Sequence, residues 1–544
     1  MLHLNRILLV ILALTKVAFA ALPATAVWDI RSTATAGNAN GGFFNSASVG
    51  TDYSLQDVAQ LSLTDLANVA ASATVTSATG GFTAQMVGNG LHVISGTNFT
   101  PSWYEIVAYI STNSVTLDRA PATNGSVGVC KIGGALSFGS ILDQTVFQLK
   151  IAGMKYYMKN GGYTFVQGVG AGGATGNINP YWFIGYNLTH GDLCIGNTRP
   201  LINVQNFDWN FGDYFIKNLR IFGANTTRIA IGGAYVDNCS FLQRSTSTTT
   251  WSYIAATNGI VSNCDFCAYR GVAAASGGDR NVFRNSVFHH SRNGLGLALG
   301  TQNAVVENNI IHSNYERAVS IDAQQLVRII FQNNTLVGSI NKVGVGFEFT
   351  LGNAGMLSTF RNIIYGFTTG VVSTTANTAN IDDYNVYFNN TANVTNVANW
   401  QIGPKTVTID PGFTGIGIHS GSTATTTSGD HLVQTGALFV HGSIPVVAGR
   451  DCVCIVSGTG VTAGYYGIAS VDSDVQITTD IALTANATAN KVWFITVGQD
   501  FTPGPTMKGL GGLVFPGQYT QGYADPGAVQ QFGTGGGGDA VFAR

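Results

Sequence analysis

The chain has 544 residues, of which 45% are hydrophobic, only 10% are charged and 69 are glycine. A hydrophobic content of this size can build a core, which argues against a disordered chain. Its 26 basic residues nearly balance 28 acidic ones and form no cluster, which argues against a nucleic-acid-binding surface.

The first twenty residues have the pattern of a secretory signal peptide. Arg6 ends a short polar start, an apolar run follows from Ile7 to Leu14, and small residues precede Ala20. We therefore expect cleavage after Ala20 and a secreted or cell-surface protein. A membrane anchor and a start codon assigned too far upstream are the alternatives, although the apolar run is short for a bilayer span. The rest of the chain predicts no stable membrane span.

Residues 21–138 and 417–500 predict two small β-modules of related sequence. Residues 95–118 align without a gap on residues 457–480, with nine identities that include Tyr104/Tyr466 and Asp118/Asp480. We expect one short helix between Tyr53 and Leu66, and a linker over the Ser/Thr/Gly-rich stretch 419–429. The modules are either caps for the ends of a solenoid or accessory domains for attachment.

Between the modules, an asparagine followed three residues later by an apolar residue recurs eight times. The spacings are 20, 25, 22, 23, 25, 29 and 23 residues, each long enough for one coil of a solenoid. The pattern predicts a right-handed parallel β-helix over residues 139–416, with a ladder of stacked asparagines inside and the apolar residues filling the coils. The pairs are Asn218/Ile221, Asn238/Phe241, Asn263/Phe266, Asn285/Phe288, Asn308/Ile311, Asn333/Leu336, Asn362/Tyr365 and Asn385/Phe388.

The seven cysteines do not form an evident disulfide framework. Cys239 and Cys264 each follow a ladder asparagine and should therefore lie on adjacent coils, either as buried thiols or as a disulfide. A lone C-x-x-C (Cys264 and Cys267) and a C-x-C (Cys452 and Cys454) lack a second pair at zinc-site spacing, so we expect no metal and no cofactor. Residues 501–544 form a Gly/Pro-rich tail, and we expect its last ten residues to be mobile.

The ladder phrases, the GGYTF and FIGY stretches before them and the DPGF and GYADPGAVQ phrases after them resemble the pectate-lyase-like superfamily of right-handed parallel β-helix proteins. That family includes polysaccharide lyases, glycoside hydrolases, bacteriophage tailspikes and adhesins, so the resemblance implies an extracellular polysaccharide or glycan as partner. The N-T-D, G-H-G and R-I-K motifs of one enzyme branch do not occur here, and Asp382-Asp383 is the one D-D pair. Whether the chain is an enzyme is therefore open.

Three successive coils carry the densest group of ionisable and aromatic residues in a charge-poor chain. We expect His289 and His312 to stack, because they occupy the same position of the repeat. Glu316 with Asp265 or Asp322 is the candidate acid and base pair of a glycosidase, with the two histidines as further candidates. The candidate substrate-binding residues are Tyr269, Arg270, His290, Arg292, Tyr315 and Arg317. The alternative interpretation is an ordinary solvated face with local ion pairs.

Two functions follow from these observations. The first is a secreted or surface-displayed β-helix that binds, and in one version cleaves, extracellular polysaccharide. The second is a structural attachment protein, such as a phage tailspike, tail fibre or adhesin, whose shaft forms a homotrimer and lies at a virion surface.

Overall fold

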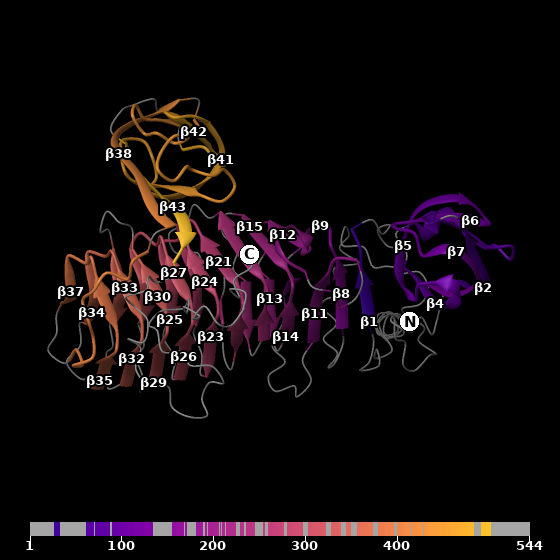
Figure 1. The fold of residues 1–544 in the computed structure, drawn as a ribbon, viewed down its shortest axis with the longest axis horizontal. Coiled ribbons are helices and arrows are strands. Elements are labelled where there is room, and N and C mark those ends of the chain that lie inside the picture. Colours follow the sequence, from indigo (N-terminus) through magenta and orange to yellow (C-terminus); the bar gives the residue numbers. More distant parts are fainter. Residues whose placement is uncertain are drawn as a thin grey trace, which may run out of the picture. The chain divides into compact units, whose positions relative to one another are not determined.

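A computed structural model describes residues 27–32, 61–133, 155–170, 181–212 and 214–501, apart from short gaps within these ranges. The protein is all-β, as the sequence predicts, and it consists of a parallel β-solenoid and two small closed barrels (Figure 1). Two compact units are present, one containing residues 1–169 and 174–201 and the other residues 170–173 and 202–544. The predicted signal peptide and the predicted tail after Phe501 lie outside the described residues. Among the described residues, no helix is long and apolar enough to cross a membrane.

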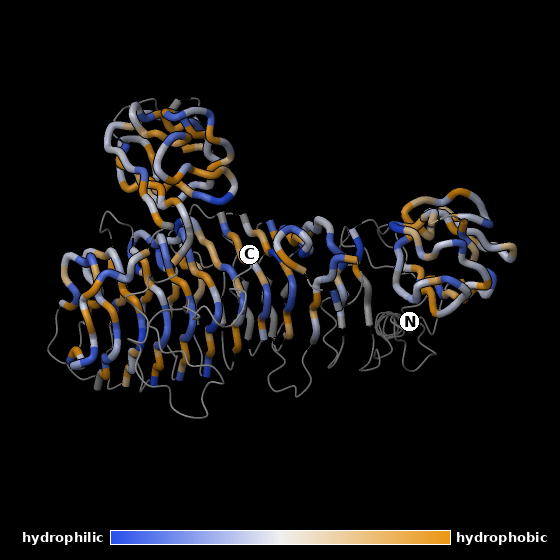
Figure 2. The backbone as a smooth tube through the Cα atoms, in the orientation of Figure 1, coloured by the Kyte–Doolittle hydropathy of each residue, from blue (hydrophilic) through white to orange (hydrophobic). Residues whose placement is uncertain are grey.

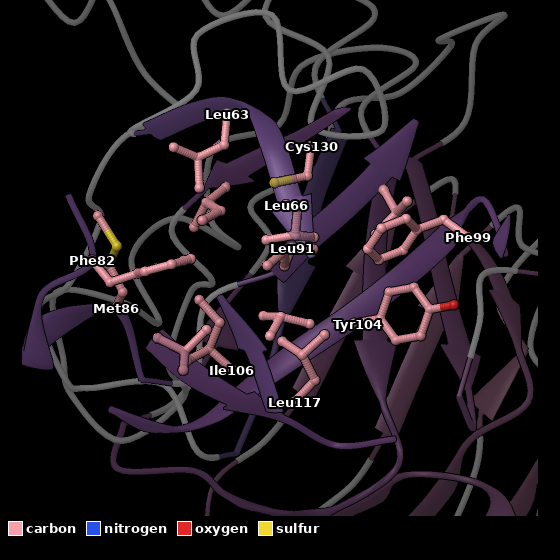
Figure 3. Close-up of a cluster of buried hydrophobic side chains, with 14 of the residues drawn as sticks. Leu63, Leu66, Phe82, Met86, Leu91, Phe99, Tyr104, Ile106, Leu117 and Cys130 are labelled. Carbon is pink, nitrogen blue, oxygen red and sulfur yellow. The ribbon is translucent and has the colours of Figure 1, made fainter. Parts of the chain in front are cut away.

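The first unit contains a six-stranded closed barrel around one apolar core. Its strand order is β2-β3-β6-β5-β4-β7. Leu91, Ile106 and Leu117 lie in the core with other apolar side chains, as Figure 3 shows. The strands are β2 (Leu61–Asn68), β3 (Thr74–Thr76), β4 (Gly90–Phe99), β5 (Ser102–Ser111), β6 (Ser114–Leu117) and β7 (Ala122–Gly133), and a 3₁₀ turn η1 covers Ala84–Met86.

The predicted helix between Tyr53 and Leu66 is wrong where the structure describes it. Leu61 to Leu66 belong to strand β2, which pairs with β7. A β-bulge lies between Leu63 and Leu66, and both side chains enter the core. The bulge places two buried residues three positions apart, which is also the spacing expected of an amphipathic helix.

The barrel of the first unit is joined to the first coils by buried ion pairs. Lys159 ends strand β8, and its Nζ lies 2.6 Å from Glu105 Oε2 and 2.7 Å from Asp118 Oδ2, both on the barrel. Arg31 Nη1 lies 3.6 Å from the same Glu105 oxygen. Burial alone would raise the pKa of Asp118, but the charge and hydrogen bond of Lys159 hold it below the ordinary value. In these coils, β1 (Val27–Ile30), β8 (Lys155–Lys159) and β11 (Tyr181–Tyr186) pair in parallel, accompanied by β9 (Gly162–Thr164), β10 (Val169–Gly170) and the 3₁₀ turn η2 (Gly196–Thr198).

In the second unit, each coil contributes one strand to each of three parallel sheets. Hydrophobic and hydrophilic residues follow one another along the strands (Figure 2), and buried side chains alternate with more exposed ones in strands such as β14 and β26. Sheet 1 holds β14 (Tyr214–Lys217), β17 (Tyr235–Asp237), β20 (Ile260–Ser262), β23 (Asn281–Arg284), β26 (Asn303–Glu307), β29 (Arg328–Gln332), β32 (Met356–Phe360) and β35 (Ala379–Asp383). Sheet 2 holds β12 (Leu201–Gln205), β15 (Arg220–Ala224), β18 (Ser240–Arg244), β21 (Asp265–Ala268), β24 (Val287–His289), β27 (Ile310–His312), β30 (Thr335–Val337), β33 (Ile363–Tyr365) and β36 (Val386–Phe388). Sheet 3 holds β13 (Trp209–Gly212), β16 (Ile229–Gly232), β19 (Ile254–Ala255), β22 (Val272–Ser276), β25 (Asn293–Leu297), β28 (Arg317–Ile321), β31 (Val345–Phe349), β34 (Thr369–Ser373) and β37 (Ala392–Thr395).

The eight predicted ladder asparagines occupy two different positions of the coil. Six of them adopt a left-handed backbone at the turn between sheets 1 and 2, with φ between 50° and 60°. Asparagine tolerates that conformation better than most residues. In the last two coils Arg361 and Tyr384 take this position, with φ of 56° and 57°. The six turn asparagines are Asn218, Asn238, Asn263, Asn285, Asn308 and Asn333.

The buried row lies one residue further along the chain, and we call it the asparagine row. Asn309, Asn334, Asn362 and Asn385 are fully buried, and each of the first three donates from Nδ2 to Oδ1 of the next at 3.0 Å. Each Nδ2 also donates to a backbone carbonyl of the preceding coil, for example from Asn309 to Phe283 at 2.9 Å. The same position in earlier coils holds Leu219, Cys239, Cys264 and Ser286.

Strand register corrects the apolar partners of the last two asparagines. Phe241, Phe266 and Phe288 stack directly, with ring centroids 4.8 and 5.1 Å apart. The row continues through Ile311 and Leu336, as predicted. It then passes to Ile364 and Tyr387 rather than to the predicted Tyr365 and Phe388. The one-residue difference follows from the two coil positions of asparagine.

The second unit ends in a barrel with the strand order β38-β39-β42-β41-β40-β43, which reproduces the order of the first barrel. Strands β41 and β42 occupy the positions that align without a gap on β5 and β6, and Gly96 and Gly458 share an unusual φ of 147° and 150°. The predicted linker 419–429 is wrong, because residues 419–427 belong to the long strand β38. The strands are β38 (Gly415–Thr427), β39 (His431–Val433), β40 (Cys452–Ser457), β41 (Gly464–Ser473), β42 (Gln476–Thr479) and β43 (Lys491–Asp500).

All seven cysteines are buried free thiols. Burial and the neighbouring Cys239 thiol raise the pKa of Cys264, as expected for two stacked thiols without a disulfide.

Candidate functional site

Several of the predicted substrate-binding residues lie beneath the C-terminal barrel. Tyr269 is 4% exposed, and its hydroxyl donates to Asp480 Oδ2 at 3.3 Å. Arg270 is 5% exposed and places its guanidinium 4.6 Å from the centre of the Tyr466 ring. The backbone also joins the two parts, since Tyr465 N–H donates to the Tyr269 carbonyl at 3.1 Å. The barrel therefore rests on the turn between sheets 2 and 3.

An apolar cluster completes the contact between the C-terminal barrel and the coils, which we call the barrel seat. Cys267 of β21 packs with Tyr465 and Phe494 of the barrel, and Tyr315 and His290 approach the Tyr465 ring at 6.0 and 5.1 Å between ring centres. These side chains contact the barrel, so a large ligand would reach them only if the barrel moved. Their proposed role in substrate binding stays a prediction.

The two barrels use equivalent residues to contact the coils. Asp118 forms an ion pair with Lys159 in the first unit, and the aligned Asp480 accepts a hydrogen bond from the Tyr269 hydroxyl in the second. An arginine lies over the ring of Tyr104 in one barrel and over the aligned Tyr466 in the other. The arginine comes from the barrel itself in the first case and from the coil in the second. The sequence shared by the two barrels thus includes residues with which each barrel contacts its coils.

Replacing Gly464 by alanine is expected to weaken the seat of the C-terminal barrel. A Cβ at Gly464 would meet Arg270 Cγ at 2.5 Å, and φ of 135° is itself unfavourable for alanine. Crowding of this kind costs about 1–3 kcal/mol, with the backbone strain added to it. Hydrogen exchange at the Tyr465 amide should accelerate. Gly162→Ala is the control, since no atom lies within 4 Å of a Cβ there; equal protection of Tyr465 in both variants would contradict the expectation.

The predicted stack of histidines is present, with ring centres of His289 and His312 5.3 Å apart and planes 8° from parallel. His289 Nε2 lies 2.7 Å from Asp265 Oδ1, and its Nδ1 lies 2.6 Å from His290 Nδ1. Burial, with a contribution from the charge of His289, lowers the pKa of His290 well below the ordinary value, so that ring is neutral at pH 7. His312 is also buried and contacts Phe501. Asp265 is the exposed end of this chain of contacts.

A group of four charged residues remains accessible where sheet 3 begins, and we call it the ionic group. Arg292 Nε lies 2.7 Å from Glu316 Oε2, and Arg317 Nη1 lies 3.4 Å from the same oxygen. Arg317 Nε contacts Glu348. All four side chains are 20–36% exposed. One guanidinium therefore holds two carboxylates from neighbouring coils.

Glu348 is the residue that the sequence prediction missed. It lies opposite Ser320 on the adjacent strand and points outward from an otherwise apolar strand. A charged residue inside the run GVGFEF is the signal that identifies it. Of the two expected partners of Glu316, Asp265 pairs with His289 instead, and Asp322 lies outside the described residues, so the second pairing stays a prediction. Among the described residues, no cluster of histidine, cysteine or carboxylate groups could hold a metal ion.

The ionic group combines the two functions that sugar recognition needs. Its carboxylates accept hydrogen bonds from hydroxyl groups, and its guanidinium groups donate them. Two carboxyl groups close together also satisfy the first requirement of glycoside hydrolysis. The neighbouring outward positions on sheet 3 are the small residues Gly296 and Ser320, which leave the charged side chains accessible.

Comparisons with known proteins agree with this architecture. Residues 202–364 match the family model of the right handed beta helix region. No curated protein matches the chain. A double mutant of the tailspike protein from E. coli bacteriophage HK620 is 9% identical, with coverage of 64% of this chain and 82% of that one and a TM-score of 0.29.

Two further solved structures are similar at the same level. Pectate lyase Pel9A is 13% identical, covers 63% of this chain and 90% of its own, and gives a TM-score of 0.31. The tailspike protein gp49 from Pseudomonas phage LKA1 is 12% identical, covers 80% and 82%, and gives a TM-score of 0.17. Values this low carry no inference about activity. The strand register shows a parallel β-solenoid that carries two small β-barrels, and the family match identifies residues 202–364 of it as a right handed beta helix region.

Proposed function

We propose that the protein binds extracellular polysaccharide along sheet 3 and that the ionic group is the centre of the binding site. The observation that carries the proposal is the arrangement of Arg292, Glu316, Arg317 and Glu348, four accessible charged side chains on neighbouring coils of a charge-poor chain. Stacked coils repeat every 4.8 Å or so, which suits a ligand with a repeating structure.

The charges of the group favour a neutral sugar chain over an acidic one. Both arginines are engaged by glutamates, so the carboxylate of an acidic sugar would have to displace Glu316 or Glu348. Hydroxyl groups can instead join the existing network, because each carboxylate oxygen can accept more than one hydrogen bond.

Hydrolysis is the catalytic version of this proposal. Glu316 and Glu348 would serve as the acid and base pair, since they are the two carboxyl groups held by Arg317. In such a pair one carboxyl protonates the leaving oxygen while the other acts as nucleophile or activates water.

Affinity electrophoresis in gels containing neutral or acidic polysaccharides tests the site. We expect a neutral polysaccharide to retard the protein. The double variant Glu316→Gln/Glu348→Gln should bind it at least tenfold more weakly, which corresponds to about 1.4 kcal/mol. Asp265→Asn is the matched control, because Asp265 contacts His289 rather than the ionic group. Retardation unchanged in the double variant would place binding elsewhere, and no retardation by any polysaccharide would refute the function.

Reducing-end assays on the retained polysaccharide then decide between binding and cleavage. Turnover that either Glu316→Gln or Glu348→Gln lowers by about 100-fold or more would support acid and base roles. Binding without turnover favours the alternative, a structural attachment protein such as a tailspike or adhesin with a homotrimeric shaft. The docking of the barrel over Tyr269 and Arg270 favours that alternative, since it uses part of the ionisable surface for assembly.

We also infer that the protein acts outside the cytoplasm. The sequence of the first twenty residues supports this inference, with its apolar run and the small residues before Ala20. N-terminal sequencing of protein recovered from the culture medium tests it: a start at Ala21 is expected, whereas an intact Met1 in cell extracts would contradict it.

A further inference from the structure

The outward face of sheet 1 carries a row of eight residues in register, seven of which are apolar. Parallel pairing places one residue of each strand in register with a residue of the next strand. The rings of Phe215 and Tyr235 stack at 4.5 Å, and Ile330 and Ile381 are 42% and 48% exposed. The row consists of Phe215, Tyr235, Ile260, Val282, Val305, Ile330, Ser358 and Ile381.

This face is large enough for a specific interface. The eight strands, at a spacing of about 4.8 Å, cover about 38 Å, and their three to five residues cover about 10–16 Å in the other direction. The face therefore offers about 540 Å² per copy, or about 1,100 Å² for two copies, which exceeds the roughly 1,000 Å² expected of a specific interface. The apolar row runs across this face beside charged residues, and an apolar patch with a polar rim marks an interaction site more often than a solvated face.

A second outward row runs beside the apolar one and carries charges in a definite order. Lys217 lies at one end and Asp383 at the other, while Arg284 and Glu307 lie on the two central strands, β23 and β26. Asp237 and the buried Ser262 lie between Lys217 and Arg284, and Gln332 and Phe360 lie between Glu307 and Asp383. Reversing the order of the coils brings Arg284 against Glu307 and Lys217 against Asp383. Asp237, which Lys217 already contacts within the same chain, comes against Phe360.

We propose that sheet 1 is the interface of an antiparallel homodimer, with a two-fold axis that runs along the strands between β23 and β26. Such an axis places Arg284 of one copy against Glu307 of the second copy, and Lys217 against Asp383. Ser262 then faces Gln332, and the apolar rows face each other, with Ile260 against Ile330 and Val282 against Val305. Opposite charges at facing positions fix the register of an interface.

Arrangements with parallel helix axes fit less well. A two-fold axis along the helix would bring the start of each strand against the end of the same strand in the second copy. Arg280 is exposed at the start of β23, and it would face Arg284 at the end of that strand, so like charges would meet. A second copy in reversed orientation is therefore the occupant that the charges select.

Sedimentation velocity on the full chain tests the proposal over about 1–100 µM, the range in which an interface of this size is expected to dissociate. We expect a species of twice the 57.0 kDa chain mass at the upper end. Ile330→Asp should shift the midpoint of association at least tenfold to higher concentration. Val447→Asp in the C-terminal barrel, where the side chain is 42% exposed, is the control and should have no effect.

Mixing two charge variants distinguishes the antiparallel register from every other one. Arg284→Glu alone and Glu307→Arg alone should each associate at least tenfold more weakly, because each copy then faces a like charge. An equimolar mixture of the two variants should recover the dimer, because positions 284 and 307 of one variant then face opposite charges on the other variant. The contacts within each chain are the same in the mixture as in that variant alone. A wild-type monomer at all concentrations, a trimer, or unimpaired self-association of Arg284→Glu would each overturn the proposal.

Discussion

Asn334→Leu is expected to lower the free energy of unfolding by about 3–5 kcal/mol, a large effect for a single substitution. Asn334 is fully buried, and its Oδ1 accepts hydrogen bonds from the backbone N–H and the side-chain Nδ2 of Asn309, both at 3.0 Å. Its Nδ2 donates to the carbonyl of Val306 at 2.9 Å. Leucine has a similar volume, but it leaves these groups without partners in a site that water cannot enter.

The adjacent residue provides the control. Asn333 is equally buried and has a left-handed φ of 54°, but neither polar atom of its side chain has a hydrogen-bond partner among the described residues. Asn333→Gly keeps the backbone conformation and should change the free energy of unfolding by less than about 1 kcal/mol. Equilibrium unfolding in guanidinium chloride measures both variants. Similar losses in the two would contradict a special role for the asparagine row.

Asp382→Ala is expected to destabilise the last coil by about 3–5 kcal/mol, because it removes a buried acceptor shared by several donors. Asp382 is 1% exposed, and its Oδ2 accepts hydrogen bonds from the Tyr387 hydroxyl and from Trp400 Nε1, both at 2.7 Å. Asn385 Nδ2 donates to its other oxygen. Asp383→Ala, at the half-exposed neighbouring position, should cost about 1 kcal/mol or less. Chemical denaturation compares the two.

The effect of Asp382 also depends on pH. Burial raises the pKa of Asp382, although the hydrogen bonds from Tyr387, Trp400 and Asn385 lower it in part. As the pH rises, the Asp382 carboxyl therefore loses its proton in the unfolded chain near the ordinary pKa of 3.8, and in the folded chain only at a higher pH. The contribution of Asp382 to stability is largest at or below that pH and decreases as the pH rises through the raised pKa. The difference in unfolding free energy between wild type and Asp382→Ala should shrink accordingly; a difference that grows with pH would contradict this.

The fold could be predicted from the sequence because every coil needs the same kinds of residue at its turn and in its interior. The interval between asparagines reports the length of a coil, whichever of its two positions the asparagine occupies. The same ambiguity hid the true register, since asparagine suits both the left-handed turn at Asn333 and the buried row at Asn334. Only strand pairing separates the two positions. The helix expected near Leu66 was wrong for a similar reason, because a bulge gave a strand the spacing of a helix.

The candidate site was predictable in composition and less so in its contacts. Register on the coils correctly placed His289 beside His312, because stacking follows directly from the repeat. The partners of Tyr269 and Arg270 lie about 200 residues further along the chain, in the C-terminal barrel. No local sequence pattern predicts how that barrel packs against the coils. Glu348 was missed because its role depends on Arg317 in the preceding coil.

The asparagine row makes the length of the β-helix adjustable. Asn309 and Asn334 are 25 residues apart and present the same groups to the coils on either side. The chain between any two asparagines of the row can be deleted or duplicated as a whole number of coils. The coils that then become neighbours again place one asparagine side-chain amide against another. The earlier coils lack this property, since Leu219 and Cys239 cannot replace an asparagine as donor or acceptor. Gain or loss of whole coils during evolution should therefore concentrate in residues 309–385.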